Sequence, residues 1–368
     1  MDKNDFLAKY RAGTMTRREF KKALAAFGIG VVSVPLVHKV VRAADLPLLL
    51  GWGGYDEEGF HQQFISKFGD PPLFSAFGDE EEAFAKIRAG FQPDATMICS
   101  YKVPHWAAAG VIQPIDTSRL PNFADSIEML TNVPGTIIDG ERYWVCQDWG
   151  QTSILYRHDL VELEEESWGL MWDERYSGRL AMIDSLIDGV MVAAIYGGAE
   201  DPFDMTDEEV VMTKDLLKEQ LPLLRYYTNS MTDIENSLAS GELVAAVAWN
   251  EAYAALLGEE VPVSWMQPKE GAMTWTCGLV LMSGAEDVDG AYEIIDSLLS
   301  PSAGVYEMSE WGYGHANKKA FEMIDTKDLL RVGLPEDPNT LLNSGIFQKP
   351  IQNEPELQTM FEEVKAGF

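Results

Sequence analysis

The sequence predicts an α/β protein of two lobes with mostly parallel sheets. The chain has 368 residues, more than the roughly 250–300 residues at which a single hydrophobic core stops growing. Apolar residues make up 46% of the chain and can fill two cores. From residue 46 onward, strand patterns alternate with helix patterns, which is typical of parallel sheets covered by helices.

The first predicted elements form a strand–helix–strand unit. Leu46–Gly51 has the continuous apolar character of a buried strand. Asp79 can cap a helix that carries an apolar face and ends at Gly90, and Ala95–Cys99 is the next strand. This order places two strands of one sheet on either side of a helix.

The later elements repeat the pattern. Thr206 with Glu209, and Thr232 with Glu235, have the spacing of a capping box at the start of a helix. We expect the second of these helices to end near Gly241. The remaining predicted elements are a strand at Leu243–Ala248, a strand at Leu279–Met282, a helix at Asp289–Leu299 ended by Pro301, and a helix at Glu356–Lys365.

The first 44 residues differ from the rest of the chain. Thr16-Arg17-Arg18-Glu19-Phe20-Lys21-Lys22 precedes the apolar run Ala23–Val37, and small residues flank Arg42. This segment resembles a twin-arginine export signal, cleaved near Ala43, which implies the twin-arginine translocase as a partner and a periplasmic location. The alternative, an amphipathic surface helix, needs a one-sided apolar stripe that Ala23–Val37 lacks. If cleavage fails, the segment would remain as a membrane anchor.

The charge of the chain is strongly negative. The formal net charge is -31, and residues 1–44 hold nine of the 28 basic and three of the 59 acidic residues, so the remaining chain carries 19 basic and 56 acidic residues. Nucleic acid is excluded as a partner because phosphate binding needs clustered Lys and Arg. An acidic field concentrates small cations. A solvated surface adapted to a salty exterior explains the same charge without a site.

No enzyme motif or cofactor motif is present. Cys99, Cys146 and Cys277 are an odd number without a C-x-x-C pair, so we expect unpaired, buried cysteines and no metal site. The five histidines lie far apart and lack ligand spacing. An exported redox or amine-converting enzyme, using for example Cys99 with His105, is the alternative from another class, and turnover of an amine would identify it.

Aromatic residues follow the carboxyl ends of the predicted strands. Trp52 and Tyr55 follow the first strand, Tyr101 the next, and Trp249 the strand after Gly241. Ligands of open α/β sheets bind at that edge. Aromatic faces attract cations, although sugars also stack on such rings and single rings are common packing residues.

Several short motifs occur in a characteristic order. They are Leu50-Gly51-Trp52-Gly53-Gly54-Tyr55, Ile98-Cys99-Ser100-Tyr101, Trp149-Gly150-Gln151-Thr152, Asp184-Ser185-Leu186-Ile187-Asp188, Ala248-Trp249-Asn250, Gln267-Pro268-Lys269-Glu270-Gly271 followed by Trp275, Gly312-Tyr313 and Phe347-Gln348. With these motifs, the chain from about residue 46 to 368 resembles the spermidine/putrescine-binding proteins of bacterial ABC transporters.

The resemblance implies a two-lobed periplasmic-binding-protein fold of type II, each lobe a mostly parallel sheet flanked by helices. The implied lobes are 45–150 plus 277–315 and 151–276 plus 316–368, with the ligand in the cleft between them. The implied partners are a small organic cation and an ABC permease in the inner membrane, the protein being a monomer without cofactor. The implied ligand cage comprises Trp52, Tyr55, Tyr101, Trp249, Trp275, Tyr313 and Gln348.

The sequence departs from the family where amines are gripped. Ser185 and Cys277 stand at two family aspartates, Asp188 at a family glutamate, and Cys99 at a serine, so one of three carboxylates remains. A buried ammonium without a partner is costly. The sequence therefore leaves open a polyamine, a ligand with a single cationic or quaternary centre, or substitute carboxylates from Asp56, Glu57 or Asp184. A sensor that passes its liganded state to a receptor would use the same cleft.

Overall fold

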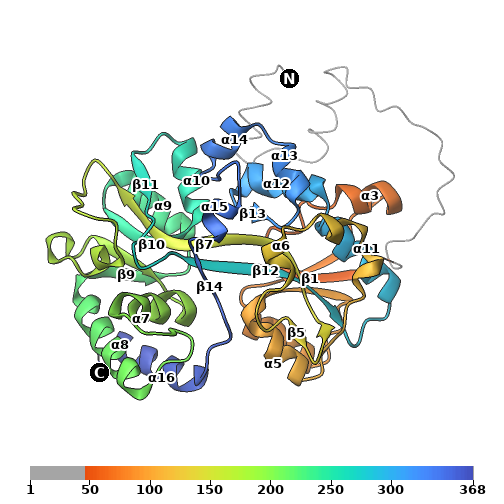
Figure 1. The fold of residues 1–368 in the computed structure, drawn as a ribbon, viewed down its shortest axis with the longest axis horizontal. Helices are drawn as coiled ribbons and strands as arrows, with labels where there is room; N and C mark the ends of the chain where they lie inside the picture. The colour runs from red at the N-terminus through yellow and green to blue at the C-terminus, as the bar shows by residue number, and fades with distance from the viewer. Residues whose placement is uncertain (1–45, 368) are drawn as a thin grey trace. The chain divides into compact units, whose positions relative to one another are not determined.

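Two long antiparallel strands cross the molecule and organise its fold. The computed structural model describes residues 46–367, which belong to one compact unit of the chain. In it, β7 (Val145–Arg157) pairs with β12 (Met273–Met282) from Met273 opposite Thr152 to Leu279 opposite Val145. All residues of β7 except the last are buried. Figure 1 shows both strands running between a group of elements at the right and another at the left.

The first lobe extends the sheet from β12. Its strands follow the order β2-β1-β3-β12, and β1 pairs in parallel with both neighbours while β3 pairs antiparallel with β12. The strands are β1 (Leu48–Trp52), β2 (Leu73–Phe77), β3 (Ala95–Cys99), β4 (Ile112–Gln113), β13 (Gly314–His315) and the separate β5 (Ile137–Ile138) and β6 (Glu141–Arg142).

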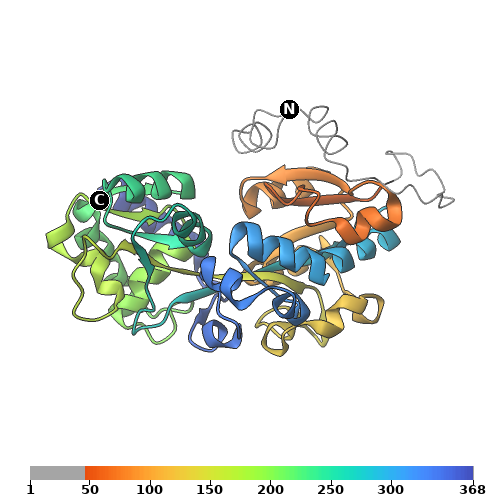
Figure 2. The same cartoon turned by 90° about the horizontal axis from the view of Figure 1, so that it is seen from above.

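Helices from two distant parts of the chain cover this lobe. They are α3 (Gln62–Phe68), α4 (Glu80–Arg88), α5 (Val103–Ala108), α6 (Glu128–Thr131), α11 (Val288–Leu298), α12 (Pro301–Trp311), α13 (Lys318–Glu322), α14 (Thr326–Arg331) and α15 (Asn339–Leu342). In Figure 2 the blue pair α11 and α12 lies beside the orange strands, and both helices contact α3.

The second lobe extends the sheet from β7 in the order β7-β10-β8-β9. Strand β10 is antiparallel to β7, whereas β10, β8 and β9 are mutually parallel. The elements are β8 (Leu180–Ile183), α7 (Met191–Gly197), α8 (Asp207–Gln220), β9 (Leu224–Thr228), α9 (Met231–Ser240), β10 (Ala245–Trp249), α10 (Asn250–Gly258), β11 (Val263–Trp265), β14 (Ile346–Phe347) and α16 (Glu354–Lys365). Helix α16 returns the chain to this lobe and packs on α8.

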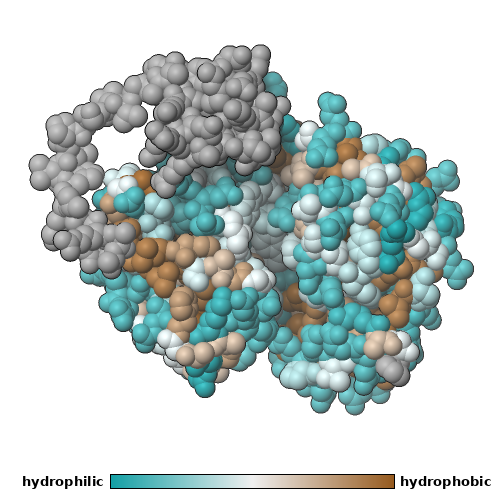
Figure 3. Space-filling model, turned by 180° about the vertical axis from the view of Figure 1, so that it is seen from behind, coloured by the Kyte–Doolittle hydropathy of each residue, from teal (hydrophilic) through white to brown (hydrophobic). Residues whose placement is uncertain are grey.

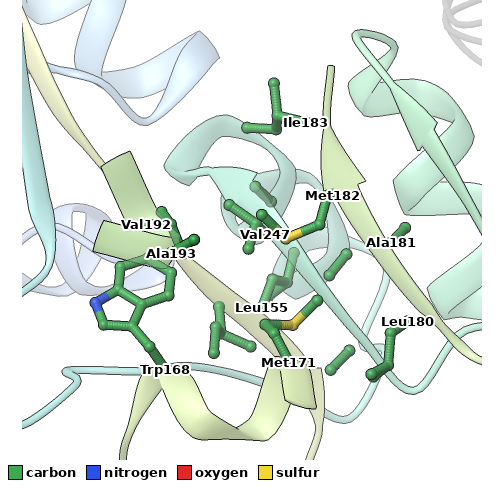
Figure 4. Packing of buried hydrophobic residues seen from close by; sticks show 14 of the residues in the cluster. Leu155, Trp168, Met171, Leu180, Ala181, Met182, Ile183, Val192, Ala193 and Val247 are labelled. Atoms are coloured by element: carbon green, nitrogen blue, oxygen red, sulfur yellow. The ribbon is translucent and has the colours of Figure 1, made fainter. Parts of the chain in front are cut away.

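Each lobe has its own hydrophobic core. Leu50, Ile98 and Trp144 are fully buried in the first. Leu155, Met182 and Val247 are fully buried in the second, together with Trp168 (Figure 4). The expected lobe boundaries stay a prediction, and the packing of residues 316–342 with the first core favours a later return of the chain to the second lobe.

Most local sequence signals match the structure. Asp79 caps α4 by accepting from the Glu82 amide, and Thr206 with Glu209 forms the capping box of α8. The second predicted capping box, Thr232 with Glu235, was wrong. The residue that caps α9 is Ser230, two residues before Thr232, and the helix begins at Met231. Pro301 does end the preceding helical segment, but it also opens α12 as its first residue, a position that tolerates the missing N–H.

Two further observations concern the chain's relation to membranes. The predicted export signal and its Ala43 cleavage site lie outside the described residues. Among residues 46–367, no helix combines the length and the apolar character needed to cross a bilayer.

Candidate functional site

The structure gathers rings from both lobes around β12. Trp275 and Tyr313 are buried together with Cys99 and Cys277, and Tyr101, Trp249 and Trp311 pack against them. We call the five rings Tyr101, Trp249, Trp275, Trp311 and Tyr313 the aromatic cluster. The Tyr313 ring stands edge-on to Trp275, with 4.8 Å between centroids, and lies 6.1 Å from Trp311. The surface is hollowed where the two lobes meet (Figure 3).

Local backbone features place these rings. Tyr101 lies in the turn that follows β3, and Trp249 is the last residue of β10 and the cap of α10. Gly150 on β7 lets the Trp275 indole approach the strand, since a Cβ there would lie 2.2 Å from the ring. Gly54 has φ +98°, and its Cβ would lie 2.8 Å from Trp311. A larger residue at either glycine would displace a ring of the cluster.

Cys99 and Cys277 form a disulfide inside this site. The expectation of unpaired cysteines was therefore wrong for these two, while Cys146 is free and buried. The pair lies on directly opposed positions of β3 and β12. The two cysteines are 178 residues apart in sequence, so no spacing signal could reveal that the sheet makes them neighbours.

Asp188 is held by neutral donors from the second lobe. It lies in the turn Leu186–Val190, and its two carboxylate oxygens accept from the hydroxyls of Thr152 and Ser185, each at 2.7 Å. Burial raises the pKa of Asp188, against the effect of these hydroxyls and of a hydrogen bond with Trp249. Asp188 thus reaches the aromatic cluster through Trp249.

Tyr55 is tied to two buried carboxyl groups. Its hydroxyl contacts Asp148 and donates to Glu307 at 3.1 Å, and its ring lies 4.8 Å from Trp311. Burial raises the pKa of Asp148 to about 6. Burial and the charge of Asp148 raise the pKa of Glu307 well above its usual range. Both effects favour the protonated form of Glu307.

Two glutamates beside the cluster were missed by the sequence analysis. Glu80 accepts from the Cys99 amide at 2.5 Å and interacts with the Tyr101 hydroxyl, and burial raises its pKa to about 7. Glu251 accepts from the Tyr313 hydroxyl at 2.5 Å, and burial raises its pKa. Both glutamates lie in the first turn of a helix, Glu80 in α4 and Glu251 in α10. Acidic residues are common in first turns, so nothing in the sequence marked these two as site residues.

The remaining predicted residues have other surroundings. Trp52 packs on Phe77, 4.6 Å between centroids, at the edge of the first core. Gln348 is buried beside β12, where its backbone N–H donates to the Thr274 carbonyl. Of the suggested substitute carboxylates, Asp184 pairs with Lys365 at 2.6 Å and Glu57 accepts from Tyr306. Asp56 is exposed.

The chain matches a protein-family model over most of this architecture. The model, described as bacterial extracellular solute-binding protein, matches residues 74–331. The chain belongs to this family. Members of the extracellular solute-binding family capture solutes and are not enzymes, which removes the redox and amine-converting alternatives.

Individual relatives agree with the family. The chain is 28% identical over 304 residues to the putrescine/agmatine-binding protein of Pseudomonas aeruginosa, covering 76% of this chain and 80% of that protein. It is 24% identical over 324 residues to the spermidine/putrescine-binding periplasmic protein of Escherichia coli, covering 86% and 90%. The solved spermidine/putrescine transporter substrate-binding protein of Streptococcus pneumoniae superposes with a TM-score of 0.73 at 17% identity, covering 87% and 98%. This similarity confirms the predicted periplasmic-binding-protein fold.

Proposed function

We propose that the chain captures a polyamine or a related organic cation outside the cytoplasm and delivers it to an ABC permease. Two relatives are named for putrescine, agmatine or spermidine binding, and these are all organic cations. The observation that carries the proposal is that rings of the site are hydrogen-bonded to carboxyl groups: Trp249 to the buried Asp188, Tyr101 to the buried Glu80, and Tyr313 to the half-buried Glu251. Such a site favours positive charge.

The energetics favour a cation over a neutral or anionic ligand. A cation against an aromatic face gains about 0.5–2 kcal/mol per good contact. Burial raises the pKa values of the surrounding carboxyl groups because it disfavours their ionised forms, so ionisation calls for compensation by a nearby positive charge. A bound ammonium would supply that compensation, whereas a carboxylate or phosphate ligand would add to the repulsion.

A ligand with a single cationic or quaternary centre is the second candidate. The Cys99–Cys277 disulfide occupies two positions of the site with a surface that carries no charge. An alkylated amine can pack against sulfur and aromatic rings while needing fewer hydrogen-bond acceptors than an ammonium. The disulfide also supports export, because such bonds persist in oxidising compartments; the twin-arginine route itself remains a prediction.

Calorimetric titration of the purified protein with putrescine, agmatine, spermidine, choline, γ-aminobutyrate and glucose tests the proposal. A ligand that binds only the folded state also raises the melting temperature, which gives an independent readout. We expect saturable binding of at least one of the first four compounds. Binding of glucose or of the zwitterion γ-aminobutyrate, without binding of any of the first four compounds, would contradict the proposal.

A further inference from the structure

A cavity of about 660 Å³ lies beside the aromatic cluster. It is formed by the end of β1 with α9, α10, α12 and α14, and Gly53, Trp311 and Glu251 are among its lining residues. A volume of this order is ordinary for a small-molecule site. A Cβ built on Gly53 would meet nothing within 4 Å, so the chain leaves this space open at the very strand end that carries Trp52 and Tyr55.

The cavity and the aromatic cluster share two side chains. Trp311 lines the cavity and is also a ring of the aromatic cluster. Glu251 lines the cavity, and its Oε2 accepts the Tyr313 hydroxyl of the cluster at 2.5 Å. Trp311 and Glu251 therefore border both the aromatic cluster and the cavity.

The charge of the cavity is negative. Its lining includes three carboxylates, Glu235, Glu251 and Glu310, and one guanidinium, Arg331. Arg331 is 67% exposed and approaches Asp328 at 3.9 Å. Within residues 46–367, no lysine or arginine forms an ion pair with Glu251, whose hydrogen-bond partner is Tyr313. One carboxylate oxygen of Glu251 thus remains for a ligand.

Resting on the function proposed above, we infer that Glu251 binds a second cationic group of the ligand in this cavity. The ligand is then an elongated molecule with a positive group at each end: one group lies in the aromatic cluster, and the other reaches Glu251 along the Trp311 ring. The Glu251 carboxylate supplies charge to a site in which the Cys99–Cys277 disulfide carries none. A diamine or aminoguanidine has this form, whereas a quaternary amine with one charge does not.

The test compares a diamine with its monoamine. Calorimetry would measure the affinities of 1,4-diaminobutane and butylamine for the wild type, for Glu251→Gln and for the control Glu259→Gln. Glu259 is exposed, lies at the end of the same helix as Glu251 and is not among the lining residues of the cavity. We expect Glu251→Gln to weaken diamine binding at least tenfold and butylamine binding less than threefold, and Glu259→Gln to change neither by more than threefold.

The outcomes separate this inference from the proposed function. If the wild type binds a diamine but Glu251→Gln leaves its affinity unchanged, or weakens both amines equally, the inference fails while the cationic ligand stands. If the wild type binds no amine at all, the proposed function fails. Should Glu251→Gln not fold, Ala255→Lys, on the exposed face of α10, places a competing ammonium in the cavity. It should weaken the diamine selectively, and equal loss for both amines would again overturn the inference.

Discussion

Asp188 is a buried carboxylate that the second lobe contributes to the site. Thr152 and Ser185 each donate a hydroxyl to it, so its position is set by β7 and by the turn before α7. Neutral hydroxyls orient a carboxylate without cancelling its charge. This arrangement suits a group that must remain available to a cation arriving from the cleft.

We predict that Asp188→Asn weakens binding of the best amine at least tenfold, or about 1.4 kcal/mol. The amide has nearly the same shape and can still accept one hydroxyl, but it has no charge to offer the ligand. Titration calorimetry measures the loss, with Asp184→Asn as control because Asp184 pairs with Lys365 instead. An affinity within twofold of the wild type in Asp188→Asn would assign the cation to another carboxylate.

The pairing of β3 with β12 is reinforced covalently. The Cys99–Cys277 disulfide joins these neighbouring strands and encloses most of the second lobe within its loop of 178 residues. A cross-link over a loop of this length removes much conformational freedom from the unfolded chain. The bond therefore both stabilises the first lobe and shapes the uncharged wall of the site.

We predict that the double variant Cys99→Ala/Cys277→Ala loses about 2–5 kcal/mol of unfolding free energy. Urea denaturation with and without a dithiol reductant measures this loss. The wild type should lose stability on reduction, whereas the double variant, which keeps Cys146, should not respond. A wild type that is as stable reduced as oxidised would show that the disulfide contributes nothing.

At the same scale, the sequence predicted elements better than contacts between them. Strand β3 and the caps of α4 and α8 are determined by residues close together in sequence, and the sequence predicted all three correctly. The length of β7, which crosses both lobes, was not, because a strand buried throughout lacks the alternation that marks its ends. The disulfide and the role of Glu251 were missed for a related reason: Cys99 and Cys277, like Glu251 and Tyr313, are distant in sequence and become neighbours only in the fold. Trp311 was missed although Tyr313 is close in sequence, because its contact with Tyr55 also depends on the fold.

The whole molecule combines a large negative charge with buried carboxyl groups. The net charge is -31, and burial raises the pKa of Glu80 to about 7. A carboxyl group whose folded pKa exceeds its unfolded value binds protons more strongly when folded. The stability that such a group contributes is fully present below its unfolded pKa and is lost as the pH rises through its folded pKa. The buried His315, with its pKa lowered by burial to about 4, acts in the opposite direction as pH falls below about 6.5.

We therefore predict that Glu80→Gln removes a distinct part of the pH dependence of stability. Between pH 5 and pH 8, the wild type should lose on the order of 3 kcal/mol more unfolding free energy than the variant, because burial raises the pKa of one carboxyl group from 4.5 to about 7. Urea denaturation at both pH values gives the difference, and His315 cancels because both proteins contain it. Parallel pH profiles of the two proteins would show that Glu80 does not cause this pH dependence of stability.

The lobes have separate cores, and β7, β12 and the aromatic cluster lie where the lobes meet. A crystal structure of the protein with its tightest-binding ligand is the most direct test of this account. We expect a cationic ligand between the lobes, with its charged nitrogen against the rings of Trp249, Trp275 or Tyr313 and within hydrogen-bond distance of Asp188 or Glu251. An anionic or uncharged ligand, or a ligand bound elsewhere while these rings remain packed on one another, would contradict it.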